Sequence, residues 1–539
     1  MAWGICLPAT CSSADARDIL STHLEPMRRA LQVDGSGIIV GEVQCRTMDP
    51  RKVDLNPESL KPMTKGQVSI TNWKWLAQSR PPGEPPRPFD AIHGIKACTM
   101  YMVTVGHRPF TSLGSPMFNA QFMEDFFTRP ETAIILGGTV IVDTFFFMSG
   151  CLLLYGLLER RATAKSLINI PLLYLRRYLR LAPALMLVTA FYATLFPRLG
   201  MGPLWEQHIA QERDNCINNW WANLFMVQTF VHPEEMCLIQ SWYVAVEFQA
   251  FLLCVPVAVL ICRHRRVGLY ALTFMTFLCL LIPFILTIVY NLDALLMPYI
   301  PVIQNLAKDP TFLNVYIPTY MRATPYFIGM FCALAIRWAN KNRFKLPKWL
   351  VVMFHVCSFL LLLFVCYSSW IFFRPGAPKS ALASATYAVL ARIGWSLGIS
   401  WQIFAPATGH GWWIGQVFAW RPMAPFGRLT YGAFLTHVGF QLHEVATMAT
   451  PRNVTVMYLV RNNFADFIFS YFIAMVLFLC LESPLTSLER IFIGPSNSRG
   501  SSRRPGMAPN GTYSHGGGSQ TPNAHPLMKF ERNRVENSH

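Results

Sequence analysis

The stretch that decides the fold runs from Asp90 to His107 and reads DAIHGIKACTMYMVTVGH. It is an apolar segment that carries Lys96 near its start and His107 at its end. Eleven residues of an α-helix advance by about 16 Å and turn by about 1100°, so the two side chains return to one helix face. In a membrane helix, a cation near one surface and a deep imidazole are placed to hold and act on an anionic donor. In the alternative interpretation, Lys96 extends to the lipid headgroups and His107 only ends the helix.

The composition supports the membrane setting. The chain has 539 residues, of which 53% are hydrophobic and 14% charged, and its mean hydropathy is +0.31, too apolar for a typical soluble protein. Segments long enough to cross the hydrocarbon layer recur along the chain. We expect them at 91–108, 133–158, 179–197, 240–262, 267–290, 320–338, 349–373, 383–405, 427–448 and 464–486. The sequence therefore predicts an all-α fold, a polytopic membrane bundle of about ten transmembrane helices.

The loops predict an orientation. Basic residues cluster in alternate loops, namely Arg160, Arg161, Lys165, Arg176, Arg177 and Arg180, then Arg263, Arg265 and Arg266, then Arg337, Lys341, Arg343, Lys345 and Lys348. By the positive-inside rule, the first span starts in the cytoplasm and the C-terminus lies there. We expect a multi-pass integral protein of the plasma membrane or an endomembrane. The net charge of +17 then reflects topology and attraction to anionic lipid, not nucleic-acid binding.

Two signals fall on the predicted outer side. Cys216 and Cys237 lie in one acidic loop, between Arg198 and Ile239, where an oxidising compartment allows a disulfide; two free thiols are the alternative. Asn453 begins an Asn-Val-Thr sequon between the last two spans and is a candidate glycosylation site.

The ends of the chain differ from its middle. Residues 1–75 hold Cys6, Cys11 and Cys45, residues 76–89 form a proline-rich linker, residues 90–490 form the transmembrane domain, and the tail 494–539 is predicted to be disordered. Three cysteines are an odd number for a cystine module, and the predicted orientation puts them in the cytoplasm. We therefore expect that a signal peptide, further cysteines and one span between Cys45 and Pro81 are missing from this chain.

Several polar side chains interrupt the apolar segments. Asp143 lies inside the second span, where a carboxylate either faces a functional partner or anchors a cation or helix end. Arg176, Arg177 and Arg180 follow at helical spacing beside the membrane. Arginine forks suit phosphate oxygens, although ordinary anchoring on the cytoplasmic side also explains such a cluster.

The later spans carry two more candidates. Glu247 enters the fourth span after Trp242, and His437 lies in the ninth, where a neutral imidazole in the bundle core is the simplest role. The sequence shows no metal-ligand spacing, phosphate-binding glycine loop or dinucleotide fingerprint. We therefore expect no metal and no bound cofactor.

The residues from about Asp90 to Arg490 resemble the acyltransferase-3 family of multispan membrane acyltransferases, in the animal branch called nose resistant to fluoxetine. Lys96 and His107 fit that family's basic residue, ten intervening residues and histidine. The other matching motifs are VDTFFFMSG, YLRRYLRLAP, SWYVAVEFQAF, RLTYGAFLTH and LESPLTSLE, with GICLPATC in the N-terminal segment. One departure is His93, which stands where the family usually has an aspartate.

The resemblance implies transfer of an acyl group from acyl-coenzyme A, as co-substrate, to a hydroxyl of a lipid, sterol or glycan acceptor. It implies that His107 is the essential histidine, as general base or transient acyl carrier. Lys96, Arg176, Arg177 and Arg180 would hold the phosphates of the donor. The remaining candidates, Asp143, Glu247 and His437, would orient the histidine or the acceptor.

A second function remains open, because the animal branch is associated with uptake of lipids and drugs. A non-catalytic transport protein would keep the fold without the chemistry. The two functions differ at His107, which chemistry requires and transport does not. The sequence leaves the oligomeric state open.

Overall fold

A computed structural model gives the structure of the chain. It describes residues 72–73, 76–77, 87–163, 169–296, 302, 306–374, 376 and 380–493. Over these residues the regular structure is helical, and the pairing of Met117 with Arg452 is an isolated bridge outside any strand. The N-terminal cysteines, most of the proline-rich linker and the C-terminal tail lie outside the described residues.

Each of the ten predicted spans overlaps one or more helices. The principal ones are α4 (Ala91–Leu113), α7 (Asp143–Thr163), α8 (Ile170–Thr194), α10 (Trp242–Arg263), α11 (Arg265–Val289), α14 (Thr324–Lys341), α15 (Lys348–Ser368), α17 (Ala381–Ala407), α19 (Met423–Thr447) and α20 (Val456–Leu477). Among the described helical stretches, seven are long and apolar enough to cross a membrane, and α4, α14 and α19 are not among them. α4 and α19 carry histidines and charged side chains of the core, whereas α14 has only 18 residues and carries Arg337 and Lys341 in its last two turns. The prediction of a polytopic helical membrane bundle is confirmed.

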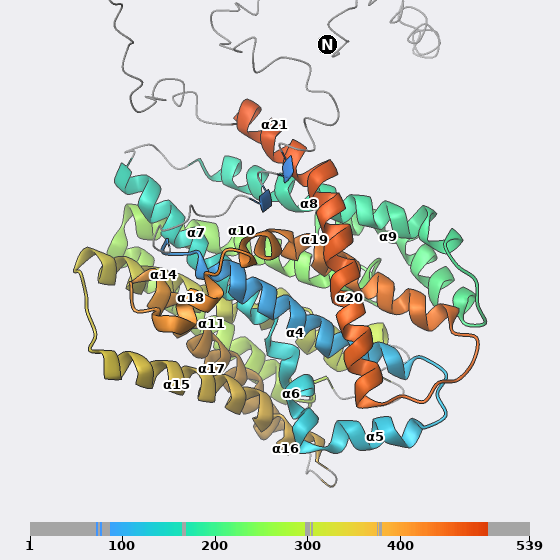
Figure 1. Cartoon of the computed structure of the whole chain (residues 1–539). Helices are drawn as coiled ribbons and strands as arrows, with labels where there is room; N and C mark the ends of the chain where they lie inside the picture. Colours follow the sequence, from blue (N-terminus) through green and yellow to red (C-terminus); the bar gives the residue numbers. More distant parts are fainter. Residues whose placement is uncertain are drawn as a thin grey trace, which may run out of the picture. The chain divides into compact units, whose positions relative to one another are not determined.

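Shorter helices connect and flank the long ones. They are α5 (Ala120–Thr128), α6 (Ala133–Leu136), α9 (Gln211–Phe225), α13 (Thr319–Arg322), α16 (Trp370–Phe373), α18 (Trp412–Phe418) and α21 (Ser483–Ile493). Single turns include η2 (Gly137–Val140), η4 (Glu206–Ala210) and η6 (Ile239–Ser241). In Figure 1, α15 and α17 lie side by side, as do α8 and α9.

Glycines bring α7 and α14 into close contact at the centre of the bundle. A Cβ at Gly150 would lie 2.0 Å from the carbonyl oxygen of Tyr326, and one at Gly329 would lie 2.1 Å from that of Phe147. Small residues at such positions let two backbones approach, which is how membrane helices gain packing energy without a hydrophobic driving force between them. This contact fixes the helix that carries Asp143.

A second group consists of α4, α19 and α20, which pack against one another (Figure 1). Gly427 of α19 meets the backbone of His93 on α4, where a Cβ would lie 2.6 Å from the His93 Cα. The prediction that α4 ends near residue 108 is too short, because the helix continues through Pro109 to Leu113. Proline removes one backbone hydrogen bond, but packing against two neighbouring helices holds the helix together.

The second predicted span, 133–158, is not a single helix. It consists of α6, η2 and α7, with a turn at Ile141 and Val142. Gly137 accounts for part of this shape, because a Cβ there would lie 2.3 Å from the carbonyl oxygen of Cys366 on α15. The break places Asp143 in the first turn of α7.

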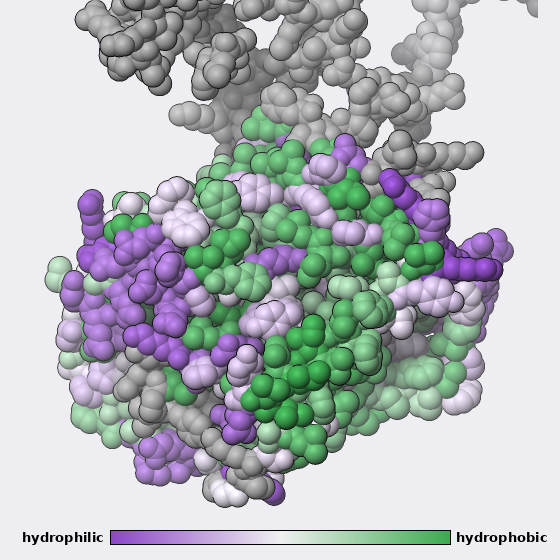
Figure 2. Space-filling view, turned by 180° about the vertical axis from the view of Figure 1, so that it is seen from behind, coloured by the Kyte–Doolittle hydropathy of each residue, from purple (hydrophilic) through white to green (hydrophobic). Residues whose placement is uncertain are grey.

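The surface agrees with a membrane setting. Seen from behind, Figure 2 shows a broad apolar area with hydrophilic side chains gathered at its margins. Large apolar side chains are exposed along α11 and α15, including Phe274, Phe277, Leu360 and Phe364. A soluble protein rarely exposes so much contiguous apolar surface.

Candidate active site

Two histidines meet in the bundle core. His107 on α4 and His437 on α19 are brought together, with Nδ1 of His107 lying 3.0 Å from Nε2 of His437. His437 is fully buried, and its Nδ1 lies 2.8 Å from the carbonyl oxygen of Phe434. The two residues are far apart in sequence, and the packing of α4 on α19 makes the pair.

The hydrogen-bond partners assign the proton positions of the neutral rings. A carbonyl oxygen can only accept, so His437 donates from Nδ1 to Phe434. Its Nε2 then carries a lone pair and accepts from Nδ1–H of His107. Consequently Nε2 of His107 is left without a proton, which is the state that a general base requires.

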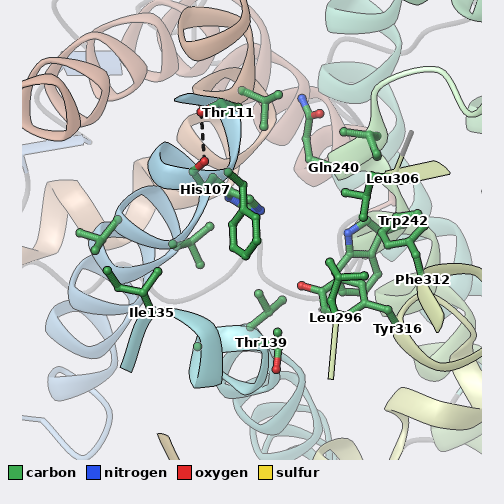
Figure 3. Close-up of a pocket in the computed structure, with 18 of the residues that line it drawn as sticks. His107, Thr111, Ile135, Thr139, Gln240, Trp242, Leu296, Leu306, Phe312 and Tyr316 are labelled. Atoms are coloured by element: carbon green, nitrogen blue, oxygen red, sulfur yellow. Dashed lines mark hydrogen bonds between the residues drawn. The ribbon is translucent and has the colours of Figure 1, made fainter. Parts of the chain in front are cut away.

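An apolar chamber lies beside this pair (Figure 3). Its volume is about 310 Å³, and His107 lines it together with apolar side chains such as Ile135, Trp242 and Phe312. We call it the apolar chamber. Glu212 of α9 and His208 of η4 line the end of the chamber that we call the outer end, after the predicted orientation. These two residues carry no motif, so reasoning from sequence missed them.

A separate basic pocket lies at the other end of the same helices. Its volume is about 460 Å³. Six cationic side chains line it, namely Lys96, Arg160, Arg176, Arg177, Arg180 and Arg428, together with Glu247, Glu482 and Glu489. The structure thus brings all four predicted donor-binding residues to one pocket. Among the described residues, no carboxylate lies within ion-pair distance of Lys96 or Arg180, so the pocket keeps unneutralised positive charge.

The chamber and the basic pocket are stacked along three shared helices, α4, α10 and α19. The chamber is lined by Met102 of α4 and Val438 of α19, whereas the basic pocket is lined by Lys96 and Phe434 of the same two helices. The residues of α10, and those just before and within α7, are likewise distributed between the lining of the chamber and that of the basic pocket. His437 falls between Phe434 and Val438 in the sequence, at the level where the two spaces approach each other.

Asp143 contacts arginines and not the histidines. Its carboxylate accepts a hydrogen bond of 3.0 Å from Arg322, and Arg392 lies 3.9 Å away. Arg322 also donates to the backbone carbonyl of Thr139 in η2. Asp143 is fully buried, so these contacts stabilise a charge that would otherwise be costly. Any effect of Asp143 on His107 stays a prediction.

Glu247 lies in the basic pocket. It forms an ion pair with Arg177, which also donates to the hydroxyl of Ser149. The guanidinium of Arg177 lies 5.4 Å from the centroid of the Phe251 ring. In this structure Glu247 therefore orients an arginine of the pocket, and a direct action on the acceptor stays a prediction.

A buried ionic cluster adjoins His107. The next residue, Arg108, is only 2% exposed and forms ion pairs with Asp466 of α20 and Glu444 of α19. Gln441 donates to the same Asp466 carboxylate, with an N···O distance of 3.1 Å. Arg108 and Asp466 were not among the residues predicted from the sequence, although charges inside apolar spans are a usable signal.

The predicted cysteine pair is at disulfide-bonding distance. Cys216 and Cys237 are bonded, with Cα atoms 4.4 Å apart. The bond ties α9 to the segment that carries Leu238, Ile239 and Gln240. We call the side of the bundle with this bond the disulfide face. Asn453 also belongs to a loop, between α19 and α20, and its glycosylation stays a prediction.

Burial changes the acidity of the residues at the outer end of the chamber. It raises the pKa of Glu212 to about 7, against a smaller opposite effect of a hydrogen bond from the Leu238 backbone. Burial lowers the pKa of His208. At neutral pH the chamber mouth therefore combines a neutral imidazole with a carboxyl group close to its midpoint.

The fold and the two pockets define a polytopic helical membrane protein with a histidine pair between a basic and an apolar space. A family model described as "Acyltransferase domain" matches residues 89–485. The chain therefore belongs to the acyltransferase-3 family.

A curated relative is similar over most of the chain. It is "Nose resistant to fluoxetine protein 6" of Caenorhabditis elegans, 24% identical over 558 residues, which cover 91% of this chain and 66% of the relative. The chain thus spans slightly less than two thirds of that relative's length. No solved structure matched the chain.

Proposed function

We propose that the protein transfers an acyl group from acyl-coenzyme A, bound in the basic pocket, to a hydroxyl of an acceptor in the apolar chamber. The observation that carries this proposal is the His107–His437 pair between two stacked spaces of different polarity. Family membership supports acyl transfer in general. The proposal goes further than family membership in three respects: the donor is acyl-coenzyme A, the acceptor lies in the apolar chamber, and the acyl group is transferred to a hydroxyl.

The basic pocket suits the donor because coenzyme A carries several phosphates. Lys96 and Arg180 supply positive charge that no described carboxylate neutralises by an ion pair, and Arg177 is held in place by Glu247. Arginine forks and a lysine together favour phosphate oxygens over other anions. The predicted cytoplasmic side of the bundle is the side on which acyl-coenzyme A is expected.

The chemistry needs one base. Nε2 of His107 takes the proton of the acceptor hydroxyl while the oxygen attacks the thioester carbonyl carbon. The new C–O bond forms, the carbonyl oxygen gains an electron pair, and its return breaks the C–S bond. The coenzyme A thiolate leaves and takes the proton back from Nε2. The products are an ester and free coenzyme A, and His107 is neutral again.

His437 acts as a positioning residue in this scheme. It accepts from Nδ1–H of His107 in both the neutral and the protonated state of that ring. The contact fixes the tautomer and the ring orientation, in the way that a third group orients the base of a catalytic triad.

The experiment is acyl transfer from labelled acetyl-coenzyme A, or a longer acyl donor, in proteoliposomes. Wild type is compared with His107→Gln and with His443→Gln, whose ring packs against Trp205 outside the chamber. We expect His107→Gln to lose at least a hundredfold in rate and His443→Gln to stay active. Thermal unfolding of each variant shows whether the fold is retained. Equal rates for the three proteins would overturn the proposal.

Transport without chemistry is the second candidate function. The stacked arrangement of the two spaces favours it, because spaces placed end to end also suit passage of a molecule across the bundle. Uptake of a labelled apolar compound into the same proteoliposomes separates the two. Transport predicts uptake that survives His107→Gln, together with no acyl transfer by wild type.

A further inference from the structure

The apolar chamber offers few hydrogen-bonding groups to a ligand. The Thr111 hydroxyl donates to the carbonyl oxygen of His107 at 3.0 Å, and the Gln240 amide donates to that of Leu435 at 2.9 Å. Most of the other lining side chains are apolar (Figure 3). A sugar would leave several hydroxyl groups unpaired there, at a cost of about 1–3 kcal/mol for each buried group.

Glu212 is the exception at the outer end of the chamber. Its Oε2 atom is buried and has no hydrogen-bond partner among the described residues. Unsatisfied buried carboxylate oxygens are rare in folded proteins, and such an atom beside a cavity indicates a missing donor. The donor would come from a ligand, since Glu212 and His107 line the same chamber.

Resting on the proposed function, we propose that the acceptor is an apolar alcohol whose outer end lies toward the disulfide face. Its apolar body fills the chamber, its reacting hydroxyl reaches Nε2 of His107, and a second hydrogen-bond donor at its outer end binds Oε2 of Glu212. Glu212 is therefore a specificity-determining residue of the acceptor site, supplied by α9, outside the membrane spans.

Gly106 provides a way to fill the chamber without disturbing the fold. It lines the chamber, and a Cβ built there meets no atom within 4 Å. Gly156 has the same property in the basic pocket. Gly106→Leu and Gly156→Leu therefore form a matched pair, each adding a side chain to one space, and leucine favours a helix more than glycine does.

The test measures binding in the His107→Gln background, so that it does not depend on catalysis. The probes are decanol, the matching α,ω-diol and glucose, each competing with a photoreactive decanol analogue. At pH 8, where most of the Glu212 carboxyl group is ionised, we expect the diol to bind about tenfold more tightly than decanol, because a hydrogen bond to a charged group contributes about 1.5–3 kcal/mol. Glucose should not compete. Gly106→Leu should abolish binding of both alcohols and Gly156→Leu should not.

Glu212 is tested in the same assay. Glu212→Ala should remove the preference for the diol and leave the affinity for decanol within about twofold. Glu206→Ala is the control, because Glu206 is an exposed carboxylate of the neighbouring turn that does not line the chamber. A diol preference that persists in Glu212→Ala, competition by glucose, or no effect of Gly106→Leu would each overturn the inference.

The outcome is separable from that of the proposed function. If the binding results agree but wild type transfers no acyl group, the chamber assignment stands and the enzyme proposal fails. If transfer depends on His107 but the preference for the diol is the same in wild type and Glu212→Ala, the enzyme proposal stands and this inference fails.

Discussion

Nδ1 of His107 lies 3.0 Å from Nε2 of His437, and the carbonyl oxygen of Phe434 fixes the proton on the far side of His437. This chain of two hydrogen bonds leaves one nitrogen whose lone pair accepts no hydrogen bond within the pair, Nε2 of His107, on a residue that lines the apolar chamber. The proposed chemistry and its tests follow from that nitrogen.

His437→Phe should lower kcat by about a hundredfold, because His107 would lose the acceptor that orients it. The KM for acyl-coenzyme A should change little, since His437 does not line the basic pocket. His437→Gln keeps an oxygen that accepts a hydrogen bond and should recover part of the rate. Steady-state kinetics of the two variants check this, and equal losses in both would contradict a positioning role.

Lys96→Gln should raise the KM for acyl-coenzyme A by about tenfold, because one charged contact to phosphate contributes about 1.5–3 kcal/mol. The effect should shrink at high salt. Arg266→Gln is the control, as an exposed cation near the same end of the bundle that does not line the basic pocket. A similar KM change in both variants would indicate general charge attraction instead of a binding site.

Asp466→Ala should lower the free energy of unfolding by about 3 kcal/mol, because it leaves the buried Arg108 with fewer partners. Arg452→Ala removes an exposed ion pair with Glu444 and should change stability by less than about 1 kcal/mol. Thermal unfolding in detergent compares the two. A shift of the same size in both proteins would show that the buried cluster does not stabilise the fold.

Stability should fall as pH rises through about 7, because burial raises the pKa of Glu212 from its ordinary 4.5 to about 7. The folded state holds this proton more tightly than the unfolded state, so the contribution is fully present below pH 4.5 and lost above pH 7. The full change is about 3 kcal/mol at most.

Glu212→Gln should flatten this dependence, which thermal unfolding between pH 5 and 8 measures. Its ionisable neighbours are Tyr192 of α8 and His208. Burial lowers the pKa of His208, so that ring gains charge only towards acid pH and its contribution has the opposite slope. If the pH dependence of stability is the same in Glu212→Gln as in wild type, the raised pKa of this buried carboxyl group is contradicted.

Hydropathy and charge patterns were sufficient for the existence of the helices. A motif pointed to His107 and to the basic residues that the structure gathers in one pocket, and their roles stay predictions. The patterns failed where tertiary contacts decide the local structure. The first span was expected to end at residue 108, yet packing of α4 against α19 and α20 carries the helix through Pro109 to Leu113. The close approach of Gly137 to α15 likewise had no signal in the sequence.

The sequence also did not predict which residues pair with the buried charges. Asp143 was recognisable as a costly carboxylate, but its contacts with Arg322 and Arg392 depend on how three helices meet. Glu212 lies in an acidic loop among other carboxylates, and nothing in the sequence distinguishes it from the exposed Glu206. Only the fold places it at the end of the chamber.

The central claim is that donor and acceptor occupy different spaces on the two sides of the histidine pair. Equilibrium binding of a non-hydrolysable thioether analogue of acetyl-coenzyme A to Gly156→Leu and Gly106→Leu tests it most directly. The account predicts that Gly156→Leu weakens binding at least tenfold and that Gly106→Leu leaves it unchanged. Equal affinities in the two variants, or a loss confined to Gly106→Leu, would contradict it.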